Sequence, residues 1–166
     1  MVGHSWWPPD VGKIKVNTDA TTDSIAGKIG NGIVIKNHAG DVLAASSQPF
    51  RYGLAYEVAE ELAIFRGLVF AQESGLMPCE VESDAPAVVN LIHTDNPPLS
   101  DIGTIICDIV HFLDCHPQCL VGFAPRSTNR AAHSLAKFGL TLGDDCFWME
   151  EAWVSPIILV DRPGNL

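Results

Sequence analysis

The chain has 166 residues, of which 47% are hydrophobic and 18% are charged. This length predicts one domain, and this much apolar material excludes a disordered or low-complexity protein. Twenty acidic and ten basic side chains give a net charge of −10, which disfavours nucleic-acid or membrane binding that relies on bulk positive charge.

The first half of the chain predicts three strands and a long helix. Residues 13–19 alternate between polar and apolar side chains, which indicates a half-exposed strand. Two more strands are expected at residues 28–37 and 42–47, joined by short turns, so the three form an antiparallel meander. Residues 56–74 carry apolar side chains at spacings of three and four, which predicts a helix.

Strands alternate with helices in the second half. We expect strands at residues 80–83 and 120–124, and helices at residues 85–93, 100–115 and 128–142. The whole order predicts an α/β fold with a five-stranded mixed sheet, three strands antiparallel and two parallel, flanked by helices.

Residues 1–166 are expected to form a single domain with its core at about residues 11–142. Residues 143–166 read as a tail rich in tryptophan that packs on the body. Neither a signal peptide nor a run of about 18 apolar residues is found, so we expect an intracellular protein of the nucleus or cytoplasm. The five cysteines include one close pair, Cys115 and Cys119, and favour free thiols over a zinc site.

Three carboxylates fall where α/β proteins place their chemistry. Asp19 ends the first strand, Asp84 ends the fourth, and Glu60 lies on the inward stripe of the first long helix. Singly, each has an ordinary explanation as a turn former or a solvated helix residue. Together they predict a site, because adjacent parallel first and fourth strands would bring Asp19 and Asp84 to one crevice. Clustered carboxylates suit Mg²⁺ or Mn²⁺.

Five segments carry a family resemblance through their order and spacing. They are Lys15-Val16-Asn17-Thr18-Asp19, Gly30-Asn31-Gly32-Ile33-Val34-Ile35-Lys36-Asn37, Ala59-Glu60, Val81-Glu82-Ser83-Asp84-Ala85 and Arg126-Ser127-Thr128-Asn129-Arg130-Ala131-Ala132-His133-Ser134-Leu135-Ala136-Lys137. This pattern closely resembles the plant ribonuclease H-like domain, a type 1 ribonuclease H domain related to retrotransposon reverse transcriptases. The resemblance covers roughly residues 7–153.

The resemblance implies a ribonuclease H fold with strand order 3-2-1-4-5 and a site of four acids that holds two Mg²⁺ ions. Three of these acids match Asp19, Glu60 and Asp84. The implied activity is two-metal hydrolysis of the RNA strand of an RNA/DNA hybrid. The implied state is a monomer, with a reverse transcriptase or another protein domain as a further partner.

The fourth acid of the family pattern is replaced here by His133. Two hypotheses follow. In the first, the three carboxylates suffice for catalysis, with Mg²⁺ or Mn²⁺ and with His133 as a ligand or proton carrier. In the second, the chain is a catalytically weakened or inactive module that binds nucleic acid or protein.

Nucleic-acid contacts are expected from Arg126, Asn129 and Arg130 at the entrance to the last helix. Four lysines of the meander could either form a local basic strip or lie on solvated strand faces. They are Lys13, Lys15, Lys28 and Lys36. Without a strong basic patch, we expect weak and salt-dependent binding to a duplex.

Overall fold

A six-stranded mixed sheet forms the centre of the computed structural model, which describes residues 6–51, 56–94 and 101–149. The strand order is β5-β4-β1-β2-β3-β6. The strands are β1 (Ile14–Asp23), β2 (Lys28–Lys36), β3 (Val42–Arg51), β4 (Cys79–Ser83), β5 (Leu120–Phe123) and β6 (Cys146–Met149). Strands β1, β2, β3 and β6 pair antiparallel, whereas β4 pairs parallel with both β1 and β5.

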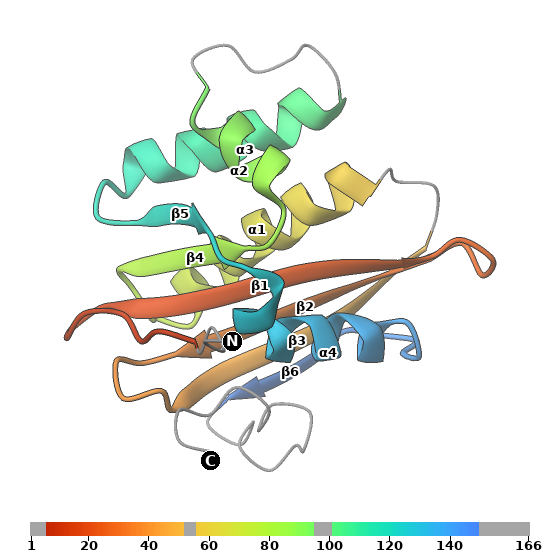
Figure 1. Cartoon of the computed structure of the whole chain (residues 1–166), viewed down its shortest axis with the longest axis horizontal. Coiled ribbons are helices and arrows are strands. Elements are labelled where there is room, and N and C mark those ends of the chain that lie inside the picture. Colours follow the sequence, from red (N-terminus) through yellow and green to blue (C-terminus); the bar gives the residue numbers. More distant parts are fainter. Residues whose placement is uncertain (1–5, 52–55, 95–100, 150–166) are drawn as a thin grey trace.

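Helices cover both faces of this sheet (Figure 1). They are α1 (Tyr56–Glu73), α2 (Pro86–Ile92), α3 (Asp101–Cys115) and α4 (Arg130–Gly139), with a short 3₁₀ turn, η1 (Arg126–Thr128), before α4. The first three helices share one apolar core with the sheet, whereas α4 packs alone on the other face. None of the helices in the described ranges is long and apolar enough to cross a membrane.

The expected fold class and the order of the first five strands are confirmed, and the sheet has one strand more than expected. Residues Cys146–Met149, assigned from sequence to the tail, form β6 beside β3. Phe147 packs on Phe70 of α1, with ring centroids 5.4 Å apart, and Trp148 packs on Phe138 of α4 at 6.3 Å. Both faces of this strand therefore meet aromatic side chains, so it lacks the polar alternation that marks a half-exposed strand.

Two glycines of β2 let α4 lie directly on the sheet. A Cβ atom at Gly30 would collide with the carbonyl group of Ala136, and one at Gly32 with the carbonyl oxygen of Ala132. Only hydrogen at these positions permits this close approach of helix and strand backbones. The Gly-Asn-Gly sequence therefore fixes the height of α4 above β1 and β2, and with it the position of His133.

The N-terminal segment covers part of the sheet face beside α4. The Trp6 side chain is buried, and its indole N–H donates to Asn17 at 3.1 Å. The Lys15 ammonium lies under this cover, 2.6 Å from the Glu82 carboxylate, and Lys36 lies over the Trp6 ring at 4.6 Å. Lys15 and Lys36 are therefore neither a surface strip nor solvated, contrary to both sequence interpretations. Trp7, the next residue, is 74% exposed.

Candidate active site

Three carboxylates from different elements meet where the C-terminal end of β4 lies beside the middle of β1. Asp19 was expected to end the first strand, but β1 continues past it to Asp23, and Asp84 follows the last residue of β4. The parallel pairing of Thr18 with Ser83 places the two aspartates side by side. Glu60 reaches them from α1 and accepts the Ala20 N–H at 3.3 Å. One ligand oxygen from each of the three carboxylates lies within 4.8 Å of the others.

Burial makes ionisation of these carboxyl groups energetically unfavourable. Asp19 is 2% exposed and Glu60 is fully buried. Burial, and then the charge of Asp84, raise the pKa of Asp19 to about 6. Burial, and then the charge of Asp19, raise the pKa of Glu60 to about 9. The metal-free protein therefore keeps part of this cluster protonated at neutral pH.

The donor set fits a hard divalent cation. Oxygen is the only donor atom that the three side chains offer, and this suits Mg²⁺ or Mn²⁺ rather than a softer metal. The Glu60 Oε2 and Asp84 Oδ1 atoms are buried and have no hydrogen-bond partner. Buried polar atoms are normally paired, so an oxygen cluster left open in this way is what a metal site requires. Asp19, Glu60 and Asp84 are the residues that would hold the ion.

His133 lies beside the cluster and contacts residues on two sides. Its Nδ1 atom is 2.6 Å from Asp19 Oδ2. One guanidinium nitrogen of Arg126 lies 3.2 Å from Nε2 and 3.3 Å from Nδ1, so the guanidinium lies over the face of the ring. The carboxylate of Asp19 faces Nδ1 and accepts, so the proton belongs on Nδ1 and the lone pair on Nε2. With this assignment Nδ1 is engaged by Asp19, and the Nε2 lone pair points to the other side of the ring, away from Asp19.

Of the three residues expected to contact nucleic acid, two are exposed and one is buried. Arg126 and Arg130 are exposed, the first at η1 and the second at the start of α4. Asn129 is fully buried, and its amide donates to the Thr18 carbonyl at 2.8 Å. Asn129 therefore anchors the start of α4 to β1, one residue before Asp19, and does not reach the surface.

Tyr56 is a neighbour of the site that the sequence interpretation missed. It lies four residues before Glu60 on α1, on the same helix face, and is about half exposed. Burial and the charge of Glu60 raise the pKa of its hydroxyl, and the closeness of this hydroxyl to Glu60 lowers the pKa of the Glu60 carboxyl. The spacing of four was the signal available in the sequence.

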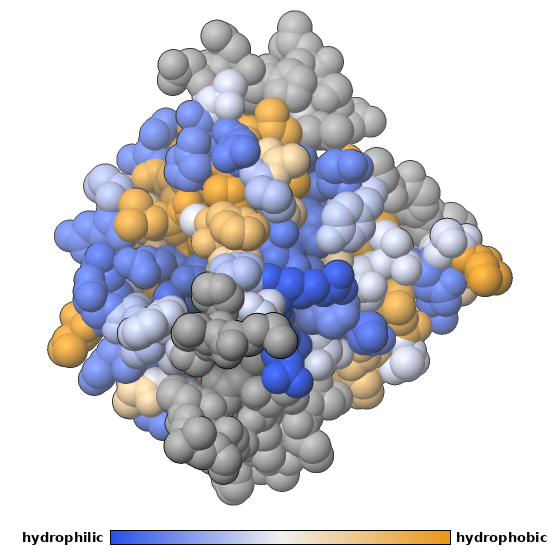
Figure 2. Space-filling view, in the orientation of Figure 1, coloured by the Kyte–Doolittle hydropathy of each residue, from blue (hydrophilic) through white to orange (hydrophobic). Residues whose placement is uncertain are grey.

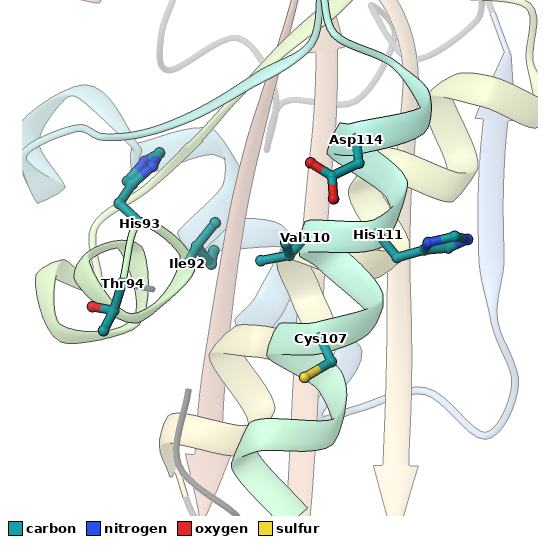
Figure 3. A pocket seen from close by; sticks show the side chains of 7 residues that line it. All are labelled: Ile92, His93, Thr94, Cys107, Val110, His111 and Asp114. Carbon is teal, nitrogen blue, oxygen red and sulfur yellow. The ribbon is translucent and has the colours of Figure 1, made fainter. Parts of the chain in front are cut away.

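A separate pocket of about 450 Å³ lies between α2 and α3 (Figure 3). The side chains that line it are Ile92, His93, Thr94, Cys107, Val110, His111 and Asp114. None of the three site carboxylates is among them. In the described part of the chain, the only group of three or more metal-ligating side chains is Asp19, Glu60 and Asp84. The candidate catalytic side chains therefore lie where β4 ends beside β1, and not in this pocket.

Comparison with known proteins agrees with this geometry. The model of a family described as reverse transcriptase-like matches residues 17–139. The chain belongs to this family. The matched range of the reverse transcriptase-like domain contains all three carboxylates and His133. A "Putative ribonuclease H protein" of Arabidopsis thaliana is 29% identical over an alignment of 171 positions that covers 99% of this chain and 26% of that protein. The chain thus spans about a quarter of this relative.

Solved ribonucleases H share the fold. The RNase H1 called LC11, isolated from compost, is 25% identical, with a TM-score of 0.70 over 79% of this chain and 97% of that chain. The same enzyme in complex with an RNA/DNA hybrid has a TM-score of 0.68, with 24% identity over 77% of this chain and 96% of that one. The N-terminal RNase H domain of a Mycobacterium tuberculosis protein has a TM-score of 0.67, with 22% identity over 78% of this chain and 94% of that one. The resemblance to ribonuclease H is confirmed.

Proposed function

We propose that this reverse transcriptase-like domain is a metal-dependent nuclease that cuts the RNA strand of RNA/DNA hybrids. The observation that carries the proposal is the buried convergence of Asp19, Glu60 and Asp84 on one point. The similarity to an RNase H1 that was solved with an RNA/DNA hybrid supplies the substrate class.

The three carboxylates share the work of holding Mg²⁺ or Mn²⁺. When bound, the ion supplies a water activated for in-line attack on the phosphodiester and neutralises charge on the leaving 3′ oxygen. Asp19 and Asp84 are fixed by the paired strand ends, and Glu60 is fixed by the Ala20 N–H. The His133 N–H holds the second oxygen of Asp19, so this carboxylate is oriented before the substrate arrives.

The acidic surface makes hybrid binding depend on the metal. The chain carries a net charge of −10, and the face seen in Figure 2 is mostly hydrophilic, with its apolar residues in separate patches. Phosphate binding to such a surface needs local positive charge, which a bound ion, Arg126 and Arg130 would supply. Affinity for a hybrid is therefore expected to be weak without metal and to fall with added salt.

A second candidate is a weakened or inactive module that keeps the fold for binding nucleic acid or a protein domain. The observation in its favour is that His133, which is hydrogen-bonded to Asp19, stands where the family pattern has its fourth acid. Both candidates place the protein where RNA/DNA hybrids occur, in the nucleus or cytoplasm.

Substrate choice tests the proposal against this alternative. The chain is incubated with hybrid, duplex RNA and duplex DNA of one sequence, each strand labelled, with Mg²⁺ or Mn²⁺. The nuclease should cut only the RNA strand of the hybrid, and the inactive module should bind without cutting anything. Absence of cleavage with both metals, in protein that binds the hybrid, would favour the module.

A further inference from the structure

The environment of Asp19 limits how many ions the site can hold. Two ions about 4 Å apart need a carboxylate that gives one oxygen to each. Asp19 lies between the other two carboxylates on one side and α4 on the other, and one of its oxygens already faces His133 at 2.6 Å. A second ion bridged by Asp19 would have to lie at the place that the imidazole occupies.

His133 cannot act as a ligand there while its hydrogen bond to Asp19 persists. Its Nδ1–H is directed at Asp19, and its Nε2 lone pair points to the other side of the ring, away from the place that an ion bridged by Asp19 would need. Metal binding through imidazole requires a free lone pair on nitrogen. The side chain thus fills the position without offering a donor.

Arg126 adds a permanent positive charge behind the ring. Its guanidinium stays protonated at any working pH, and one of its nitrogens lies 3.2 and 3.3 Å from the two ring nitrogens. The guanidinium therefore adds a positive charge close to the imidazole that holds the outer oxygen of Asp19. A dication at the same place would be repelled by this group.

We propose that the Arg126–His133 pair is a built-in cation that takes the place of a second divalent ion, so that the centre binds one ion through Asp19, Glu60 and Asp84. This inference rests on the proposed function of the same site. It departs from the two-ion site that the family resemblance implies. The pair would neutralise the negative charge on the outer oxygen of Asp19 permanently, whereas a second ion would do so only when it is bound.

Counting ions tests the proposal without measuring activity. Bound Mn²⁺ per chain is measured by electron paramagnetic resonance, for the free chain and for its complex with a hybrid whose central RNA residues carry 2′-O-methyl groups and resist cleavage. We expect one ion per chain in the complex of the wild type and two in that of His133→Asp, which adds a carboxylate facing Asp19. His133→Ala, which removes the ring without adding a ligand, and Lys137→Ala, which changes an exposed residue of α4, should both stay at one.

Two results would overturn the inference. The first is two Mn²⁺ ions in the wild-type complex, and the second is one ion in a folded His133→Asp complex. If His133→Asp does not fold, nitrogen NMR of the wild type decides instead. The inference expects the proton of His133 on Nδ1, with Nε2 unaffected by added Mg²⁺, and the opposite tautomer or a metal-shifted Nε2 would contradict it.

The outcomes separate this inference from the proposed function. A single ion in a chain that binds the hybrid and never cuts it would leave the inference standing and remove the nuclease. Cleavage of the hybrid by a chain that holds two ions would support the nuclease and overturn the inference. If the hybrid does not bind at all, the proposed function fails, and the NMR measurement still tests the role of His133.

Discussion

The Nδ1 atom of His133 lies 2.6 Å from Oδ2 of Asp19 and joins α4 to the first strand at the cluster of three carboxylates. The position of this bond is set by packing elsewhere. Asn129 ties the start of α4 to the Thr18 carbonyl, and Gly32 lets the helix approach β2. The electrostatics of the site therefore depend on how closely α4 lies on the sheet.

Replacing Asp19 by Asn should have opposite effects on metal binding and on metal-free stability. Mn²⁺ binding should weaken by roughly 100-fold, about 3 kcal/mol, because one of three anionic ligands is lost. The metal-free variant should melt at a higher temperature at pH 8, because a buried carboxylate that is costly to ionise has gone. Calorimetric titration and thermal melting measure the two effects.

Asp144→Asn is the matched control, since Asp144 is exposed and lies outside the cluster. It should change neither quantity. Mn²⁺ affinity unchanged in Asp19→Asn would show that this carboxylate is not a ligand.

The metal-free protein should lose stability as the pH rises from about 4 to 9. The pKa of Asp19 is raised from 3.8 to about 6, that of Glu61 from 4.5 to about 7 and that of Glu60 from 4.5 to about 9. Raised values mean that the folded state keeps protons that the unfolded state releases, so increasing pH favours unfolding. For Asp19 alone the shift corresponds to about 3 kcal/mol.

Urea unfolding at pH 5, 7 and 9 measures this dependence. Saturating Mg²⁺ should reduce the share of this pH dependence that comes from Asp19 and Glu60, because the ion stabilises their charged forms. A free energy of unfolding that rises with pH in the absence of metal would contradict the account.

Glu61 is a buried carboxyl that the proposed chemistry does not use. It is fully buried, and neither of its oxygens has a hydrogen-bond partner. Burial, and then the charge of Glu57, raise its pKa to about 7. Glu61→Met should therefore raise the free energy of unfolding at pH 8 by roughly 1–3 kcal/mol, and by less at pH 5.

The control for this change is Glu73→Met, at an exposed position in the last turn of α1. It should change stability by no more than about 0.5 kcal/mol. If Glu61→Met destabilises the protein at pH 8, the side chain has a partner that its surroundings do not show.

Adding one methyl group to β2 should displace α4. A Cβ atom at Gly32 would meet backbone atoms of Ala132 and Ala136, which cannot give way as a flexible side chain does. Gly32→Ala should therefore cost roughly 1–3 kcal/mol of stability and weaken the His133–Asp19 contact. Denaturant unfolding gives the first effect, and the nitrogen shifts of His133 give the second.

Gly122→Ala provides the comparison, because a Cβ atom at this strand glycine meets nothing within 4 Å. It should leave both measurements close to those of the wild type. Equal losses in the two variants would mean that the packing of α4 on Gly32 is not what matters.

Local patterns were enough to predict the three carboxylates. Alternation places Asp19 on the first strand, although β1 continues past it to Asp23, and the inward position of Glu60 follows from helical spacing. Their convergence needed only the correct order of two parallel strands, which is a property of the fold class.

Other features depend on contacts between distant segments. The burial of Lys15 and Lys36 depends on the Trp6 ring that covers them, and nothing near either lysine in the sequence indicates that cover. Asn129 was predicted to lie exposed at a helix start, but its amide donates to the Thr18 carbonyl, 111 residues earlier in the chain. The strand Cys146–Met149 is too short to show a period. Tertiary packing decides all of these.

The most direct test of the nuclease is analysis of the RNA products made from an end-labelled RNA/DNA hybrid with Mn²⁺ or Mg²⁺. The account predicts cleavage within the RNA strand, with 3′-hydroxyl and 5′-phosphate ends, that stops when the metal is chelated and in Asp19→Asn. Cleavage that persists in Asp19→Asn or without divalent metal would contradict it, as would an intact RNA strand with both metals.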